Sequence, residues 1–323
     1  MIGHGGNAAN GTKTGDLTVT TADGSITLQG AAGGNDSLAQ IGHGGRSGSG
    51  TSYGNITVTA QGAGADVSVR GGNGGQAMAM IGHGGTGTGG AVGQATDLIQ
   101  VTAENDVNVI GGGTNNALAQ IGNGGLAAGG TKAGDISIIA GGDVFVTGGQ
   151  TGGDDAYAMI GNGGAQISNT VSGSISINAG GLVELRGGTN PTPANSSADT
   201  PNFAQIGHGG HESRGTLGAT GDKIEISADT VSLIGGSGAQ AYAQIGMGGY
   251  DAGGSLTGDI CVHADTAVIL DANSGGSGDH GYAQIGNGGT LAGSGTSSYT
   301  GFITVVSGSG GVDLRGGDSG SGR

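Results

Sequence analysis

The sequence has no tryptophan, one cysteine, three prolines and nine lysine and arginine residues among its 323. Cys261 cannot form an internal disulfide, so cysteine usage does not report the redox compartment. The scarcity of proline excludes polyproline structure, and the 83 glycines lack the three-residue period of collagen. A formal net charge of −15 disfavours binding to nucleic acid or to anionic lipid.

Long apolar runs and a secretory leader are also missing. No stretch approaches the roughly 18 apolar residues of a membrane-spanning helix, so we expect no membrane insertion. The chain opens inside a repeat motif at Ile2, and residues 318–323 stop just before the next motif is due. The sequence therefore predicts a single repeat array over residues 1–323, cut from a longer array.

One motif, Ile-Gly-(His/Asn/Met)-Gly-Gly, recurs eight times at intervals of 39 to 46 residues. Its isoleucines are Ile2, Ile41, Ile81, Ile121, Ile160, Ile206, Ile245 and Ile285. A fixed period of this size is typical of stacked supersecondary units that share one continuous core. It also disfavours an enzyme, because catalysis needs one special place and a repeat makes its places alike.

Each repeat contains three short segments in which apolar and polar residues alternate, as in a strand with one buried face. In the first full repeat they are residues 17–20, 26–28 and 38–41, separated by glycine-containing bends. We therefore predict an all-β fold, a right-handed parallel β-helix of eight repeats with three short strands each. Alternating short and long bends favour one coil per repeat over two.

Later repeats keep the same inward pairs, and the seventh copy of the second strand, Ala267 and Ile269, matches least well. The Gly/Ser-rich stretch after each motif is predicted to be a loop, which places Lys13 and Lys132 in loops. The single 46-residue interval is assigned to a surface loop insertion, residues 189–202. The positions predicted to face outward are polar: Thr18, Thr57, Gln100, Ser137, Ser176, Glu225, Cys261 and Thr304.

The variable position of the motif forms a column in a stacked coil: His4, His43, His83, Asn123, Asn162, His208, Met247 and Asn287. One interpretation is a row of metal-binding imidazoles. The other is a corner residue that hydrogen-bonds along the stack or to its own bend. Asn and His tolerate left-handed backbone, and Met247 suits neither zinc ligation nor hydrogen bonding, so we favour the second interpretation.

The bend before the third strand resembles the calcium nonapeptide of RTX toxins, as in Gly71–Met78, which lacks the aspartate. Asp36 and Asp155 occupy the aspartate position, whereas Asn116 and His280 supply no carboxylate there. Calcium needs several oxygen ligands, and this bend returns only once in about forty residues. A glycine corner is the better account, and calcium stays an alternative cofactor.

No catalytic, cofactor-binding or metal-binding residue is predicted. The GxGxxG string at residues 82–87 is a match of the kind that arises by chance in a glycine-rich chain. The GDSG string at 317–320 resembles a protease nucleophile segment, but it has no partner base nearby in sequence and the expected fold is wrong for it. An aromatic series precedes the third strand and is expected to stack along one edge, either as packing or as a carbohydrate-binding strip. Its members are Tyr157, Phe203, Tyr242 and Tyr282.

The pattern Gly-Asp-Ile-x-Val-x-Ala followed by Asp-Val-x-Leu-x-Gly-Gly resembles the shafts of filamentous-haemagglutinin-type proteins. Residues 134–140 with 142–148 are the best copy, and residues 204–210 resemble repeats of very large secreted bacterial surface proteins. The resemblance implies a secreted β-helical shaft that projects from the cell. The secretion domain and effector tip of that family have no counterpart in this sequence.

We therefore expect a non-enzymatic shaft segment of a secreted bacterial surface protein, extracellular or at the cell surface. Strand edges at both ends predict head-to-tail self-association into filaments. A host-surface or matrix carbohydrate or protein is a possible partner. The alternatives are a calcium-stabilised RTX-like binding module and, less favoured, a carbohydrate-binding or carbohydrate-active β-helix.

Overall fold

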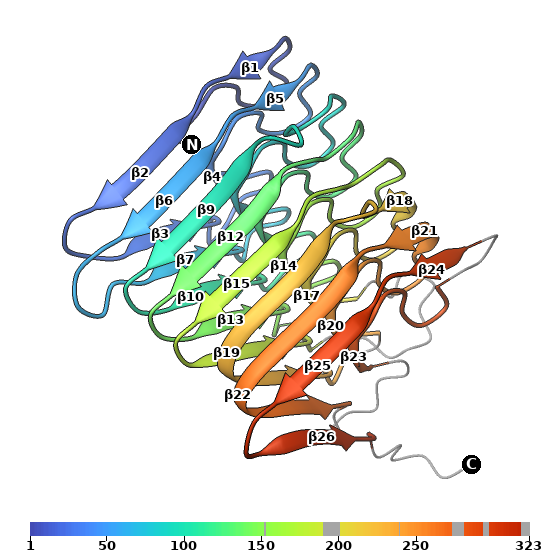
Figure 1. Ribbon diagram of the computed structural model, residues 1–323. Coiled ribbons are helices and arrows are strands. Elements are labelled where there is room, and N and C mark those ends of the chain that lie inside the picture. Colours follow the sequence, from blue (N-terminus) through green and yellow to red (C-terminus); the bar gives the residue numbers. More distant parts are fainter. Residues whose placement is uncertain (152, 190–200, 239, 273–280, 293–296, 318–323) are drawn as a thin grey trace.

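The computed structural model describes residues 1–323 except 152, 190–200, 239, 273–280, 293–296 and 318–323 (Figure 1). The described residues form strands and no helix, and they wind into a right-handed parallel β-helix of about seven turns. Blue N-terminal strands lie at one end of the stack and red C-terminal strands at the other. The predicted fold class is therefore confirmed.

One repeat makes one coil. Thr18 pairs with Thr57, and Gln100 pairs with Ser137, so each strand lies beside its counterpart one repeat later. All strand pairs formed by the described residues are parallel, which agrees with a solenoid that always winds the same way. The preference for one coil over two is confirmed.

The first face carries the Leu/Ile-x-Val/Ile segments, because alternation points every second side chain into the coil. Ile56 and Val58 are completely buried, whereas Thr57 between them is partly exposed. Its strands are β2 (Leu17–Thr21), β6 (Ile56–Ala60), β9 (Leu98–Ala103), β12 (Asp135–Ala140), β15 (Ile175–Ala179), the first halves of β19 (Lys223–Ile234) and β22 (Asp259–Asp271), and β25 (Ile303–Ser307).

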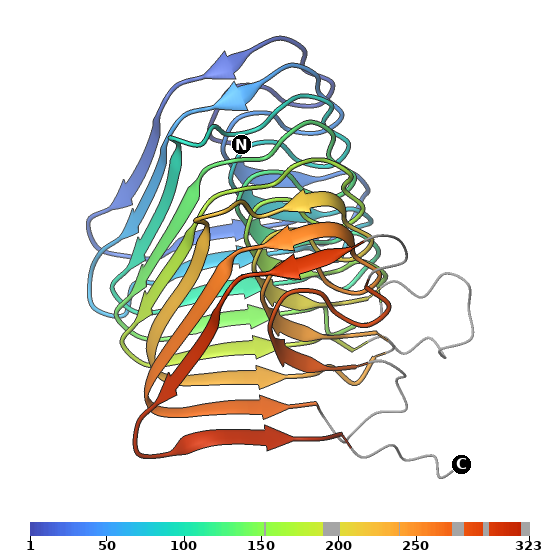
Figure 2. The same cartoon turned by 45° about the vertical axis from the view of Figure 1, so that its right-hand side comes forward.

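The second face follows after a sharp corner, which Figure 2 shows at the left edge of the stack. In β19 and β22 the strand continues through that corner. The strands of the second face are β3 (Ile26–Gln29), β7 (Val67–Arg70), β10 (Val107–Ile110), β13 (Val144–Thr147), β16 (Leu182–Arg186), the second halves of β19 and β22, and β26 (Gly311–Arg315).

The seventh copy of the second strand lies one residue further along than predicted. Its register shifts between Ala228 and Thr230, so one extra residue occupies the corner of this coil. Val268 therefore pairs with Val231 and is buried, whereas the predicted inward residue Ile269 pairs with the outward Ser232. A slip of one residue exchanges the two sides of a strand.

The third face differs from the others because both of its sides are buried. Ala79 and Ile81 belong to the interior of the coil, whereas Met78 and Met80 pack on the opposite side. Its strands are β4 (Leu38–Ile41), β8 (Met78–Ile81), β11 (Ala119–Ile121), β14 (Ala158–Ile160), β17 (Ala204–Ile206), β20 (Ala243–Ile245) and β23 (Ala283–Ile285).

A fourth ladder runs through the stretch that was predicted to be a loop, and this prediction was wrong. Lys13, Ser52, Val92, Lys132, Val171 and Leu217 stack one above the next through parallel bridges. The ladder contains β1 (Lys13–Thr14), β5 (Ser52–Tyr53), β18 (Arg214–Leu217), β21 (Gly253–Thr257) and β24 (Ser298–Thr300). The Gly/Ser-rich stretch after each motif is therefore part of the stack and is not a free surface loop.

The two lysines of this ladder are buried, not exposed in loops. Lys132 is completely buried, and its ammonium donates to the carbonyl oxygens of Ala128 and Gly130. Lys13 donates in the same way to Gly11 and Ser49. Burial lowers the pKa of Lys132 to about 8. The two ammonium groups thus supply hydrogen bonds to carbonyl oxygens of the glycine-rich stretch.

Two hydrophobic cores result. The main core fills the coil with aliphatic side chains from the first three faces and the fourth ladder, among them Val58, Val101, Ile138, Ile177 and Ile226. The second core lies on the outer side of the third face and is covered by the chain that follows the motif. It comprises Met78, Met80, Leu118, Leu126, Tyr157, Met159, Ala165, Phe203 and Tyr242, with Leu38, Tyr250 and Tyr282 packed against it.

The structure describes only the edges of the predicted loop insertion at 189–202. Residues 190–200 lie outside the described residues. The amide of Thr189 still donates to Gly149 at 2.9 Å, as a residue of the stack does. Asn202 is completely buried and accepts from the backbone N–H of Ala156 at 2.9 Å. The described residues contain no helix long and apolar enough to cross a membrane.

Candidate functional site

The repeated contact between successive coils is the candidate functional site, because the conspicuous residues of the sequence all lie in it. The motif column is its clearest part. The backbone N–H of six column residues donates to the side chain of the next one, as His4 does to His43 Nδ1 at 2.9 Å and His83 to Asn123 Oδ1 at 2.9 Å. The exception within the stack is His208, which is followed by Met247. The same contact joins Asn162 to His208 at 3.0 Å.

The second nitrogen of each of these side chains is also engaged. His43 Nε2 lies 2.8 Å from the carbonyl oxygen of Gly15, and His83 Nε2 lies 2.8 Å from that of Gly54. Since Nδ1 accepts and a carbonyl can only accept, the imidazoles are neutral with the proton on Nε2. No ring nitrogen of these two histidines is left for a metal. The hydrogen-bonding interpretation of the column is therefore confirmed.

Burial keeps these imidazoles neutral. It lowers the pKa of His83 to about 4, against opposing contributions from the Gly54 carbonyl and Asp97. It also lowers the pKa of His43 and of His208. Removal from water disfavours the charged form of histidine. In the folded chain the imidazole of His83 therefore stays neutral, and keeps its hydrogen bonds, from high pH down to about pH 4.

Glycine is required beside the column because successive coils approach closely there. A Cβ added to Gly122 would lie 2.0 Å from the carbonyl oxygen of Gly161, and one added to Gly161 would lie 1.8 Å from that of Gly207. The backbone at Gly122 also has φ +144°, which side chains disfavour. The motif glycines therefore permit the spacing between coils.

A second polar column lies on the outer side of the third face. The amide of Gln40 donates to the carbonyl oxygens of Gly82 and Gly84 in the next coil, at 2.8 and 3.0 Å. Four glutamines make this paired contact, at distances of 2.7 to 3.3 Å: Gln40, Gln120, Gln205 and Gln244. Met80 and Met159 take the same register position in the other two coils of this series.

The aromatic series stacks as predicted, but inside the second core. Ring centroids of Tyr157, Phe203, Tyr242 and Tyr282 follow at 4.7, 4.9 and 4.9 Å, and the ring planes lie within 6° of parallel. Tyr157, Phe203 and Tyr242 have no exposed surface. These three rings are not available to a carbohydrate, because the chain after the motif covers them.

The aromatic residues are matched to the preceding coil. The hydroxyl of Tyr242 donates to Gln205 Oε1 at 3.4 Å, and that of Tyr282 donates to Gln244 Oε1 at 3.2 Å. Phe203, which has no hydroxyl, follows the coil in which Met159 replaces glutamine. Tyr157 follows Gln120, but the Tyr157 hydroxyl and Gln120 Oε1 are both buried without a hydrogen-bond partner. Two tyrosines thus bond to a glutamine of the preceding coil, and the phenylalanine follows a methionine.

The bend before the third strand is a left-handed corner. Asp36, Asn116 and Asp155 have φ of +66°, +58° and +51°. The Asp36 carboxylate pairs with Arg46. Within the described residues, no three His, Cys, Asp or Glu side chains are grouped to hold a metal ion. The corner interpretation of this bend agrees with these angles, and His280 lies outside the described residues.

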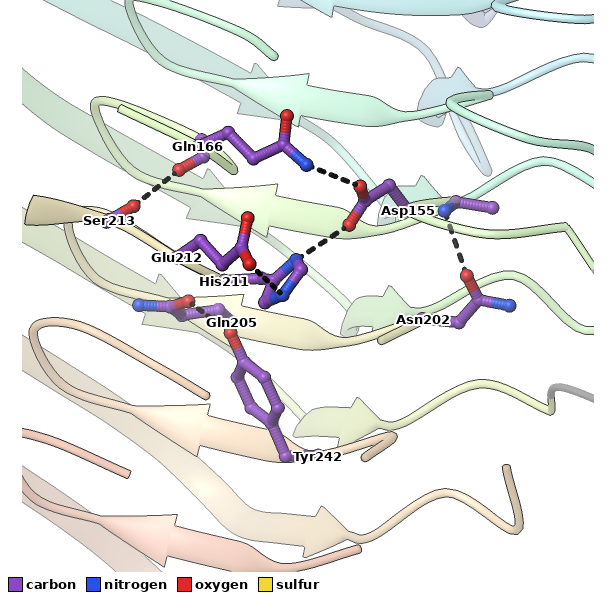
Figure 3. A network of polar contacts seen from close by, with 10 residues as sticks. Asp155, Gln166, Asn202, Gln205, His211, Glu212, Ser213 and Tyr242 are labelled. Carbon is purple, nitrogen blue, oxygen red and sulfur yellow. Dashed lines mark hydrogen bonds and ion pairs between the residues drawn. The ribbon is translucent and has the colours of Figure 1, made fainter. Parts of the chain in front are cut away.

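Asp155 belongs to a buried polar network (Figure 3). Its carboxylate lies 3.1 Å from His211 Nδ1, and both side chains are less than 5% exposed. Gln166 donates to the other carboxylate oxygen at 3.4 Å, and His211 Nε2 lies 3.9 Å from Glu212. The network joins the corner of one coil to the covering segment of the next.

This network has the residue types of a hydrolase but not the geometry. Ser213 lies two residues from His211, yet its hydroxyl is buried and donates to the Gly164 carbonyl oxygen at 2.9 Å. The ring nitrogen of His211 that does not face Asp155 faces Glu212 instead. A nucleophile needs its base within hydrogen-bond reach. The network lies beside the second core, because the ring of His211 contacts Tyr250, which packs against that core.

Comparisons with protein-family models, with curated proteins and with solved structures give no match for this chain.

Proposed function

We propose that the chain is a non-enzymatic structural shaft, a stiff segment of a bacterial surface protein that holds other parts away from the cell. The observation that carries this proposal is the continuity of the coil–coil contact. Two cores and two side-chain columns run from coil to coil, and four ladders of strands accompany them. Bending such a rod would break hydrogen bonds and open apolar contacts in several coils at once.

The engagement of the reactive side chains supports a mechanical role over a chemical one. His43, His83 and His208 use both ring nitrogens within the stack, at 2.7 to 3.0 Å from their partners. The Asp155 carboxylate is likewise held by His211 and Gln166. Groups that hold the rod together are not free to bind a substrate.

The location proposed for the shaft is extracellular, at the bacterial surface. It is supported by the resemblance of residues 134–148 and 204–210 to repeats of secreted surface proteins. An antibody raised against the folded chain should label intact producing cells, and protease added outside the cells should remove the label. Labelling that appears only after the cells are permeabilised would contradict this location.

The mechanical proposal is tested by pulling the chain from both ends with optical tweezers. One coil holds 39 to 40 residues in most repeats, as the pairs Thr18–Thr57 and Val107–Val67 show. Each coil that unzips should therefore release roughly 140 Å of contour length. A ladder of such steps is expected. Extension at low force without steps would contradict the proposal.

A carbohydrate-active role is tested separately. Incubation with a panel of acidic polysaccharides should leave their chain lengths unchanged. Shortening of any polysaccharide by the purified chain, with heat-denatured chain as the control, would favour that alternative.

A further inference from the structure

We propose that two contacts between neighbouring coils, at His83 and at His208, are acid-responsive joints. Mild acid favours release of these two histidines from the preceding coil, whereas the contacts between them in the stack, which use asparagine, stay closed. An aspartate beside each histidine keeps the coils tethered after the release. The joints are part of the fold and do not depend on the proposed function, and in a shaft they set the places at which it yields.

Each of the two histidines holds its coil to the preceding one through both ring nitrogens. His83 Nδ1 accepts from the backbone N–H of His43 at 3.0 Å, and His83 Nε2 donates to the Gly54 carbonyl oxygen at 2.8 Å. His208 makes the same two contacts with the backbone of the coil before it, at 3.0 and 2.7 Å. Neither histidine has exposed surface.

An aspartate holds the same glycine through its other backbone group. The N–H of Gly54 donates to Asp97 Oδ2 at 3.0 Å, and the N–H of Gly173 donates to Asp222 Oδ2 at 2.9 Å. In both repeats the aspartate lies 14 residues after the histidine. Each glycine is therefore bound by a histidine at its carbonyl oxygen and by an aspartate at its N–H.

Both aspartates lie in the same kind of inserted turn. From the fourth ladder to the first buried residue of the first face, the chain takes seven residues in these two repeats and four in the others. In the inserted turn the Asp97 carboxylate also accepts from the Gln94 N–H at 3.0 Å, and the Asp222 carboxylate accepts from the Ala219 N–H at 2.7 Å. No repeat with asparagine or methionine in the column has this insertion.

Acid acts on these joints because Nδ1 must be unprotonated to accept a hydrogen bond. A protonated imidazole carries a hydrogen on both nitrogens, so its Nδ1 would face a backbone N–H, donor against donor. The closed joint therefore excludes the proton and the open joint takes it up, so a falling pH favours the open joint. Asparagine does not titrate, so the contacts of Asn123 and Asn162 with the preceding coil do not respond in this way.

The surroundings of His83 keep the proton out of the closed joint. Burial lowers the pKa of His83 to about 4, and the stacked ring of His43, with centroids 5.0 Å apart, acts in the same direction. The Gly54 carbonyl oxygen and the Asp97 carboxylate oppose this shift. Stability from this joint is therefore complete above about pH 6.5 and is lost as the pH falls toward 4.

The surroundings of His208 act in the same direction. Burial lowers the pKa of His208, and the Gly173 carbonyl oxygen and the carboxylates of Asp222 and Asp135 oppose the shift. The column residue before His208 is an asparagine and the one after it is Met247, so neither neighbour in the column carries a charge. This joint therefore has no second histidine stacked on it.

The joints are tested by amide hydrogen exchange, followed by NMR on the full chain. The His43 amide reports the joint at His83, and the Asn162 amide reports the joint at His208, because each donates to that histidine. The Asn123 amide donates to asparagine and is the internal control.

The expected result follows from a pKa of about 4 in the closed joint and about 6.5 in the open one. Protection of the His43 amide relative to the Asn123 amide should fall about 20-fold between pH 7 and pH 5. Protection of the Asn162 amide should fall in the same direction. Equal losses at all three amides would overturn the joints, because acid would then loosen the whole stack.

The tether is tested in the same spectra. The amides of Gly54 and Gly173 donate to aspartate, so both should keep their protection at pH 5 while the amides that donate to histidine lose it. Asp97→Ala removes the acceptor of one of them, so Gly54 should then lose protection and Gly173 should keep it. Loss at both glycines in the unchanged chain would contradict the tether.

Two substitutions assign the response to its histidines. His83→Asn and His208→Asn each introduce the residue that the column already holds at Asn123, so the chain should stay folded, which its far-ultraviolet spectrum checks. In His83→Asn the His43 amide should lose its acid response and the Asn162 amide should keep it, and in His208→Asn the pattern should be reversed. An acid response of the His43 amide that survives His83→Asn would overturn the proposal.

Discussion

The main core and the second core share the third face as a common wall, but they are filled in different ways. The main core repeats Ile, Val, Leu and Ala with little change from coil to coil. The second core varies more along the stack, and in it Tyr242 bonds to Gln205 whereas Phe203 follows Met159. The main core therefore drives winding, and the second core distinguishes some coils from their neighbours.

This difference predicts what a slip by one coil would cost. In the main core such a slip exchanges one β-branched residue for another, as between Ile138 and Val101. In the second core it would place a tyrosine hydroxyl against methionine. Buried polar groups without partners cost about 1–3 kcal/mol each. The side chains on the outer side of the third face therefore contribute most to determining which coil stacks on which.

The largest loss of stability is expected from substituting a motif glycine. Gly122→Ala should destabilise the chain by at least about 4 kcal/mol, because its Cβ would overlap the Gly161 carbonyl oxygen. Gly24→Ala is the matched control. Gly24 has φ +142°, close to the +144° of Gly122, but no atom lies within 4 Å of the added Cβ. Equal losses in urea unfolding would show that backbone strain, not coil spacing, is decisive.

Acid should weaken the motif column next most strongly. The folded pKa of His83 is about 4 and the unfolded value about 6.5, so the unfolded chain binds more protons between these values. Stability is therefore complete above about pH 6.5 and falls as the pH drops toward 4, by about 3 kcal/mol for His83 alone. The lowered pKa values of His43 and His208 act in the same direction.

The matched variant is His83→Asn, which keeps an acceptor in the column. Urea unfolding at pH 7 should change little, whereas the loss of stability between pH 6.5 and 4 should become smaller. A pH dependence as steep as that of the unchanged chain would rule out His83 as a source of the acid sensitivity.

The pairing rule of the second core should appear as a coupling between two substitutions. Phe203→Tyr places a hydroxyl next to Met159 and should cost about 1–3 kcal/mol. Adding Met159→Gln supplies the acceptor that Gln205 gives Tyr242, and most of the loss should be recovered. Additive losses in the double variant would refute the rule.

The smallest effect is expected from calcium removal. The Asp36 carboxylate already pairs with Arg46, and that of Asp155 lies against His211. Thermal melting with calcium and with EDTA should therefore give the same midpoint. A midpoint that falls markedly in EDTA would favour the RTX-like alternative.

The strands of the main core could be predicted because alternation of apolar and polar residues determines which side of a strand is buried. The hydrogen-bonded column could be predicted from His, Asn and Met sharing one motif position. The calcium interpretation and the shaft function stay predictions. The seventh copy of the second strand was predicted one residue too early, at Ala267 and Ile269. One extra residue at the corner shifts the register there, and the composition of the segment does not reveal it.

The fourth ladder could not be predicted from alternation, because its residues stand singly in a glycine-rich stretch. The second core could not, because both sides of the third strand carry apolar residues, so alternation does not show that the strand has two buried sides. Lys13, Ser52, Val92 and Lys132 are of three different side-chain types, so no hydrophobic pattern marks the ladder. A positional signal does exist. Each lies eleven residues after a motif isoleucine, as Ser52 does after Ile41 and Val92 after Ile81. Constant distance from the motif is a better guide here than chemistry.

The central claim is that each repeat makes one coil in the register described, and the native cysteine tests it directly. Glu225 lies beside the exposed Cys261 on adjacent strands, about 4.8 Å apart, which suits a disulfide. Oxidised Glu225→Cys should therefore lose both free thiols and remain a monomer on a non-reducing gel. Ser227→Cys, whose neighbour is His263, should keep its thiols, because diagonal neighbours are about 7–8 Å apart. A disulfide in Ser227→Cys, or none in Glu225→Cys, would contradict the account.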